Sequence, residues 1–90
     1  MRQLKSTAQY RRDLKRLQRQ GKEIDAMRDV VQLLIDSAVL PSRYLDHPLK
    51  GNWIGHRELH LEGDWLLIYK VTDDAIHLVR TGSHAELLKR

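Results

Sequence analysis

Residues 53–71, WIGHRELHLEGDWLLIYKV, contain two apolar segments separated by Glu62-Gly63-Asp64. Acidic residues around a glycine are typical of a turn, so segments 53–61 and 65–71 predict the two strands of a β-hairpin. The side chains that suit the buried face of this hairpin are Leu59, Leu61, Leu66 and Ile68.

A second turn at residues 72–74 and a third predicted strand at residues 75–81 follow the hairpin. Two patterns compete in that strand, because Ile76 and Leu78 alternate on one face whereas Val79 belongs to the other. Its register therefore stays open. Residues 84–90 are expected to form a final helical turn or two.

Upstream of the hairpin, the apolar residues recur with the period of a helix. Thr7 predicts the N-cap of a first helix that Gly21 ends, and a second helix is expected at about residues 22–37. A short first strand is expected at residues 2–5, and residues 39–52 are expected to form a loop.

These elements predict an α+β fold in one domain, residues 1–90, because so short a chain has no room for a second hydrophobic core. The N-terminal short strand and a helical hairpin would pack on one face of a twisted antiparallel sheet, leaving the opposite face for function. The outer face of the first helix is basic and fits either phosphate binding or simple solvation. Its cations are Arg11, Arg12, Lys15, Arg16 and Arg19.

Composition excludes several classes of protein. There is no cysteine, which removes disulfides, thiol nucleophiles and cysteine zinc sites. The longest apolar-rich runs, residues 30–35 and 65–69, are too short to span a membrane, and the chain opens with no secretory leader. We therefore expect a cytoplasmic protein without membrane contact. The net charge of +4 slightly favours polyanions or acidic proteins as partners.

The five histidines do not form an obvious metal motif. His56 and His60 have the spacing of paired ligands on a helix, but their segment is a predicted strand, where four residues span roughly 13 Å. Two such rings cannot share one ion, so metal binding is not expected. No phosphate-binding glycine loop is present, and no cofactor is expected.

Acid–base chemistry remains. Cutting RNA without a metal requires a base for the 2′-hydroxyl, an acid for the leaving 5′-oxygen and a cation for the phosphate. Histidine exchanges protons near neutral pH, and arginine donates to phosphate without losing its charge. The chain offers His47, His60 and His84 for the first two roles and Arg80 for the third.

Four motifs, at residues 46–51, 57–60, 64–70 and 80–85, resemble the YafQ family of the RelE/ParE toxin superfamily. The resemblance covers nearly the whole chain and implies a RelE-like fold. It further implies an endoribonuclease toxin that cleaves messenger RNA in the A site of the ribosome, against ribosomal RNA, and that a cognate antitoxin neutralises. The alternative is a ParE-like toxin that inhibits a topoisomerase by binding it, without nuclease activity.

The resemblance also implies an active site. The positions that match the family motifs are His47, His60, Asp64, Trp65, Arg80 and His84. Leu88 departs from the pattern, because YafQ-like proteins can carry an aromatic residue near this point of the tail. Weaker base stacking at Leu88 would affect codon preference more than catalysis.

Roles follow as hypotheses. His84 is expected to be the general acid, His47 or His60 the base, and Asp64 the group that orients a histidine. Arg80 would stabilise the phosphate.

Two further side chains, Lys50 and Arg57, are candidate helpers of that phosphate contact. Trp65 is expected either to stack on a base or to pack against Tyr69 within the sheet.

Overall fold

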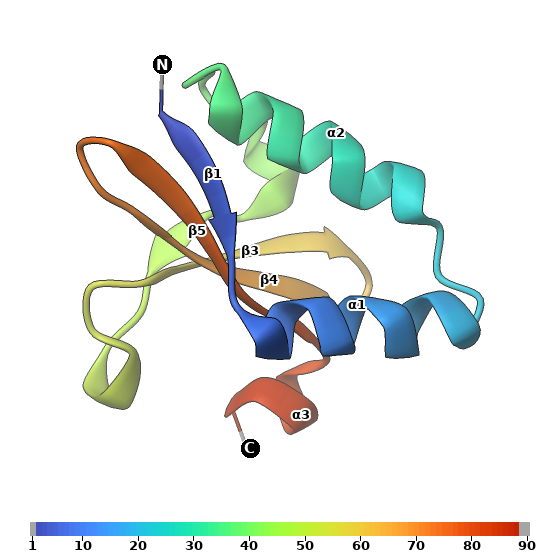
Figure 1. Ribbon diagram of the computed structural model, residues 1–90. Helices are drawn as coiled ribbons and strands as arrows, with labels where there is room; N and C mark the ends of the chain where they lie inside the picture. The colour runs from blue at the N-terminus through green and yellow to red at the C-terminus, as the bar shows by residue number, and fades with distance from the viewer. Residues whose placement is uncertain (1, 89–90) are drawn as a thin grey trace.

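A computed structural model describes residues 2–88 of the chain, and Figure 1 shows its arrangement. The described elements are β1 (Gln3–Ser6), α1 (Ala8–Arg19), α2 (Ile24–Ile35), the 3₁₀ turn η1 (Ser42–Tyr44), β2 (His47–Pro48), the 3₁₀ turn η2 (Gly51–Trp53), β3 (Arg57–Glu62), β4 (Trp65–Val71), β5 (Ala75–Gly82) and α3 (His84–Leu88). The strands form one sheet in the order β1-β5-β4-β3-β2. The predicted α+β class is confirmed, and the predicted tail helix lies partly outside the described residues at 89–90.

The first helix begins where the sequence predicts. The Thr7 hydroxyl oxygen accepts the Tyr10 N–H at 2.9 Å, which satisfies a free amide of the first turn. The same hydroxyl donates to the Val79 carbonyl at 2.7 Å, so the cap also ties α1 to β5. At the other end Gly21 adopts a φ of 90°, which ends the helix without steric strain.

The second helix is shorter than the predicted residues 22–37 and covers Ile24–Ile35. Its buried residues Met27, Val30 and Leu34 face the sheet. Figure 1 shows that α1 and α2 diverge from their connecting loop, with α1 beside β5, so the hairpin is splayed rather than closely paired. None of the described helices is long and apolar enough to cross a membrane.

The sheet is mixed rather than purely antiparallel. Strand β1 runs parallel to β5, with Leu4 opposite Ile76, whereas the other neighbours are antiparallel. The opposite edge strand, β2, lies within the predicted loop and pairs His47 with Glu58. Two residues, one of them proline, give no alternating pattern, so only tertiary pairing reveals this strand.

The two faces of the sheet differ from the prediction for the hairpin. Leu59 pairs with Leu67 on the face covered by α1 and α2, whereas Leu66 pairs with His60 on the other face. Leu66 and Ile68 therefore do not share the buried face of Leu59, and they form a second small core with Leu87 of α3. Strand β4 is buried on both faces, so its sequence does not alternate between apolar and polar residues. The pattern therefore does not show which side chains face the helices.

A β-bulge determines the register of β5, which the sequence leaves open. Ile68 pairs with Arg80 and Tyr69 pairs with Leu78, so Val79 is an additional residue between the two pairs. Leu78 then belongs to the core under the helices and Val79 to the small core on the other face. Ile76 and Leu78 thus follow the first pattern up to the bulge, and Val79 faces the opposite side as the bulge residue.

Strand β3 begins at Arg57 and not at residue 53 as predicted. Residues Gly51–Trp53 form the 3₁₀ turn η2, and Gly51 and Gly55 have φ values of 65° and 88°. These left-handed conformations, which glycine adopts readily, are incompatible with a continuous strand. The reversal places Trp53 beside Leu66 and Ile68 in the small core.

Candidate active site

Three histidines from separate parts of the chain meet on the sheet face opposite α1 and α2. His47 comes from β2, His60 from β3 and His84 from the first residue of α3. The ring centroids of His47 and His60 are 6.2 Å apart, and those of His60 and His84 are 5.5 Å apart. His60 therefore lies between the other two predicted proton carriers, and the fold brings together all three.

Asp64 fixes His84. Its carboxylate lies in the turn between β3 and β4, 2.6 Å from His84 Nδ1, and it also accepts the His84 backbone N–H at 3.2 Å. The side-chain hydrogen bond from His84 lowers the pKa of Asp64, so the carboxylate stays ionised. With Nδ1 engaged, the Nε2 atom of His84 is the one directed toward the other site residues.

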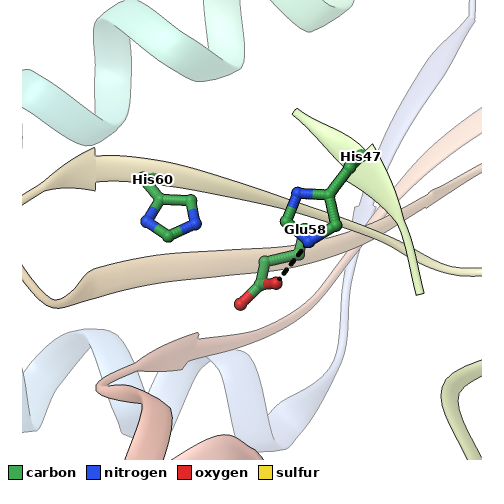
Figure 2. A group of neighbouring side chains, drawn as sticks. All are labelled: His47, Glu58 and His60. Atoms are coloured by element: carbon green, nitrogen blue, oxygen red, sulfur yellow. Dashed lines mark ion pairs between the residues drawn. The ribbon is translucent and has the colours of Figure 1, made fainter. Parts of the chain in front are cut away.

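Glu58 is a site residue that the sequence reasoning missed. Its side chain is 4% exposed, and its Oε2 lies 2.9 Å from His47 Nε2 (Figure 2). Its Oε1 lies 3.6 Å from His84 Nε2 and has no hydrogen-bond partner among residues 2–88. Glu58 stands two residues before His60 on one strand, and this spacing places both on one face, which is the signal that could have revealed it.

His47 is held by acceptors on both nitrogens. Its Nδ1 lies 2.7 Å from the Leu45 carbonyl oxygen, and its Nε2 faces Glu58. Leu45 has a φ of 50°, so the backbone turns sharply just before the site. A carbonyl and a carboxylate only accept hydrogen bonds, so both contacts are satisfied together when His47 carries two protons.

The fold also creates a group able to hold a metal. Donor atoms of His47, Glu58 and His60 all lie within 4.8 Å of one another (Figure 2). Two imidazoles and one carboxylate are donors typical of zinc or copper sites. The spacing of His56 and His60 gives no sign of this group, because its ligands come from β2 and from alternate residues of β3.

Arg80 is bound to a buried acid that the sequence did not single out. Its Nε and Nη2 atoms donate to the Asp13 carboxylate, each at 3.0 Å. Although burial opposes ionisation, hydrogen bonds led by that of Arg80 lower the pKa of Asp13, and Asp13 in turn raises the pKa of Arg80. Arg16 on the basic face of α1 also contacts Asp13, at 3.1 Å, so part of that face is structural.

Two of the predicted substrate contacts, Trp65 and Arg57, lie away from the histidines in the fold. Trp65 is 1% exposed and donates from Nε1 to Thr81 Oγ1 at 2.8 Å, so its indole packs in the core and cannot reach a base. Arg57 pairs with Asp46 at 2.8 Å on the strand face opposite Glu58, and Asp46 also accepts the Tyr69 hydroxyl. Strand alternation turns both side chains away from the histidines.

Lys50 stays near the site. It borders an open hollow of about 420 Å³ together with His47 and Trp53. A second hollow of about 440 Å³ is bordered by Arg80 and again by Trp53. Predicted cations thus lie on both sides of the tryptophan, a residue that the sequence reasoning did not select.

Comparisons with known proteins agree with the geometry. The chain is 42% identical over 87 residues to the mRNA interferase toxin YafQ of Escherichia coli K12, covering 96% of this chain and 95% of that protein. YafQ in the E. coli DinJ–YafQ toxin–antitoxin complex superposes with a TM-score of 0.89 at 42% identity, over 96% of both chains. A copper-bound mutant toxin from Helicobacter pylori superposes with a TM-score of 0.92 at 34% identity, over 97% of this chain and 99% of that one.

A family model described as the bacterial toxin YafQ of type II toxin–antitoxin systems matches residues 2–89, nearly the full length. The order of elements, the histidine group and this match agree. The chain therefore belongs to the YafQ family of bacterial toxins from type II toxin–antitoxin systems.

Proposed function

We propose that this toxin enters the A site of the ribosome and cleaves messenger RNA there by metal-free acid–base chemistry. Its class, an endoribonuclease of the mRNA interferase kind, follows from family membership and from relatives that carry this name. A cognate antitoxin neutralises it, as DinJ partners YafQ in E. coli, and its place of action is the cytoplasm. The observation that carries the mechanism is the row of three imidazoles flanked by Glu58 and Asp64.

His84 is the general acid of this proposal. The Nδ1–H of His84 donates to the Asp64 carboxylate and fixes the ring, so in the imidazolium form the Nε2–H is the proton that the leaving 5′-oxygen takes up. Asp64 is a positioning residue, since it acts through the imidazole. The Asp64 carboxylate also accepts the backbone N–H of His84, which restrains the position of the His84 backbone as well.

His60 is the better candidate for the base. Both nitrogens of His47 already face acceptors, the Leu45 carbonyl oxygen and Glu58 Oε2, so neither is free to take a proton from a 2′-hydroxyl. His60 lies between the other two rings, and no hydrogen bond fixes either of its nitrogens within residues 2–88. His47 is then a positioning residue rather than the base.

Arg80 and Lys50 supply the positive charge that the substrate phosphate requires. Asp13 engages two of the three guanidinium nitrogens of Arg80, so Nη1 is available to donate to a phosphate oxygen. Lys50 approaches from the other side of Trp53, in the hollow that His47 borders. A phosphate bound at the histidines would thus have a cation on either side.

His84→Ala tests the mechanism. Cleavage of messenger RNA in a purified translation system should fall by about 10²–10⁴-fold, the usual contribution of a general acid. The matched control is His77→Ala, because His77 lies on β5 opposite Lys70 and away from the three-ring group. Retention of full cleavage by His84→Ala would end the assignment.

The same system tests the dependence on ribosomes. Naked messenger RNA should be cut far more slowly than messenger RNA on ribosomes, because so small a site supplies few substrate contacts. The ParE-like alternative predicts the reverse order of effects in cells, with DNA replication stopping before protein synthesis. Equal cutting of naked and ribosome-bound messenger RNA would refute the ribosomal part alone.

A second proposed property is that a zinc or copper ion binds the same group and inhibits the enzyme. His47, Glu58 and His60 present their donors to one point, and Glu58 Oε1 lacks a hydrogen-bond partner within residues 2–88. A toxin from H. pylori with 34% identity has been solved with copper bound. An ion held here would occupy the imidazoles needed for proton transfer, so metal and activity would exclude each other.

Calorimetric titration with Zn²⁺ or Cu²⁺ measures this property without reference to cleavage. Glu58→Gln should weaken binding by at least tenfold, while His77→Ala should leave it unchanged. Equal binding by Glu58→Gln would place the ion elsewhere. Cleavage that requires added zinc would contradict both the inhibition and the metal-free mechanism.

A further inference from the structure

Trp53 lies between two hollows next to the histidines. The first is bordered by His47 and Lys50, the second by Arg80, and both share Asn52, Trp53 and Leu88. With volumes of about 420 and 440 Å³, they are open enough to admit parts of a nucleotide. We propose that Trp53 is the stacking platform for a nucleobase of the RNA strand beside the cut, a role that rests on the proposed ribonuclease function.

The surroundings of Trp53 keep its ring fixed but leave it accessible. The indole packs against the small core of Leu66, Ile68 and Leu87, and it is only partly buried. On another side the ring of His56 meets it edge-on, at 5.3 Å between centroids and 85° between planes. A supported aromatic ring loses little conformational entropy when a base stacks on it.

The neighbours of Trp53 have the chemistry that a nucleotide requires. Asn52 is exposed at the border of both hollows, and its amide provides donors and an acceptor for a base edge. Lys50 in one hollow and Arg80 in the other supply cations for the phosphates before and after the base. An aromatic platform, a polar group able to contact a base edge and two cations therefore border the same pair of hollows.

This assignment also explains how the chain tolerates Leu88. Base stacking at Leu88 is expected to be weaker than in related toxins, which can carry an aromatic residue near this position. In the fold Leu88 borders the same two hollows as Trp53, so the aromatic surface comes from η2 and Leu88 adds an aliphatic wall.

Tryptophan fluorescence tests the proposal without any cleavage. The chain has two tryptophans, and Trp65 is 1% exposed, so quenching by a stacked base reports on Trp53. The probe is a short single-stranded RNA whose 2′-deoxy substitutions prevent cutting. We expect this RNA to quench the wild type. Trp53→Leu lacks the reporting ring, so its affinity is compared with that of the wild type by the fluorescence anisotropy of an end-labelled RNA, and it should be about tenfold weaker, as expected for the loss of one stacked base.

Three further variants serve as a control and as independent tests of the platform. Ile54→Ala is the matched control, because Ile54 is 78% exposed, adjoins Trp53 and borders neither hollow. Trp53→Phe should retain most of the affinity while losing the quenching signal, and Leu88→Phe should tighten binding several-fold. If Trp53→Leu fails to fold, Trp53→Phe and Leu88→Phe still test whether Trp53 is the stacking platform.

The outcomes separate this proposal from the function on which it rests. Absence of quenching in the wild type at millimolar RNA, or equal affinity in Trp53→Leu and wild type, would overturn the platform while cleavage dependent on His84 persisted. Stacking on Trp53 in a protein that never cuts RNA would uphold the platform and reject the nuclease.

Discussion

Two buried carboxylates, Asp13 of α1 and Glu58 of β3, have different hydrogen-bond environments. Asp13 is fully buried, and its oxygens accept hydrogen bonds from Arg16, Arg80 and the Thr81 N–H. Glu58 is 3% exposed, but its Oε1 has no hydrogen-bond partner within residues 2–88. A buried charge is costly unless it is paired, so the first site is complete and the second is left open.

The difference indicates that one carboxylate stabilises the fold and the other takes part in the chemistry of the site. Asp13 joins α1 to β5 and holds Arg80 in place, so its contacts serve the structure. Glu58 faces His47 and His84 with an oxygen to spare, so a proton, a substrate or an ion can complete its contacts. Stability should therefore depend on Asp13 and activity on Glu58.

The largest expected effect is that of Asp13→Ala on stability. It leaves Arg80 and Arg16 without their shared partner and should cost about 3–5 kcal/mol, the usual loss when one member of a buried ion pair is removed. Urea unfolding followed by circular dichroism measures this. Asp25→Ala is the control, since its pair with Arg28 is exposed and contributes about 0.5 kcal/mol or less. If Asp13→Ala lowers the free energy of unfolding by less than about 1 kcal/mol, Asp13 does not have the structural role that distinguishes it from Glu58.

Glu58→Gln should affect activity and spare the fold. The amide keeps the shape of the side chain but removes the charge that faces His47 and His84, so messenger RNA cleavage should fall by about 10²-fold. The free energy of unfolding should change by less than about 1 kcal/mol, because the amide oxygen can still accept from His47 and Oε1 has no hydrogen bond within residues 2–88 to lose. Strong destabilisation with intact cleavage would reverse the roles of the two carboxylates.

Acid should weaken the fold through Asp13. Its pKa is lowered from 3.8 in the folded protein, so the unfolded chain binds the proton more readily. The stabilisation is therefore fully present above about pH 4 and is lost as the pH falls through the lower folded value. Urea midpoints between pH 6 and pH 2.5 should decline in this range for the wild type, and Asp13→Asn should show a flatter profile. Parallel profiles would contradict the assignment.

The smallest effect is expected at Arg57, on the helix-covered side. Its partner Asp46 raises the pKa of Arg57 and engages its guanidinium, so Arg57→Ala should change cleavage by less than about threefold and stability by about 0.5–1 kcal/mol. Cleavage assays beside urea unfolding measure both quantities. A drop comparable to that of Glu58→Gln would mean that Arg57 reaches the substrate after all.

Much of the fold is predictable from local pattern. The Thr7 cap, the Gly21 stop and the turn before Asp64 depend on residues within a few positions of one another, and all three occur where predicted. The strand parity around Leu66 is not predictable, because a strand buried on both faces shows no alternation. Strand β2 is too short to leave a pattern.

The sequence by itself determined that Thr7 caps a helix which Gly21 ends, and that three strands follow in the second half, because helix caps, turns and apolar periods act over a few residues. The tertiary structure alone decided that Glu58 joins His47, that Asp13 holds Arg80 across 67 positions, and that Trp53 rather than Trp65 is accessible. The physical reason is that strand register and burial are set by packing of the whole core, and a shift of one residue turns a side chain to the opposite face.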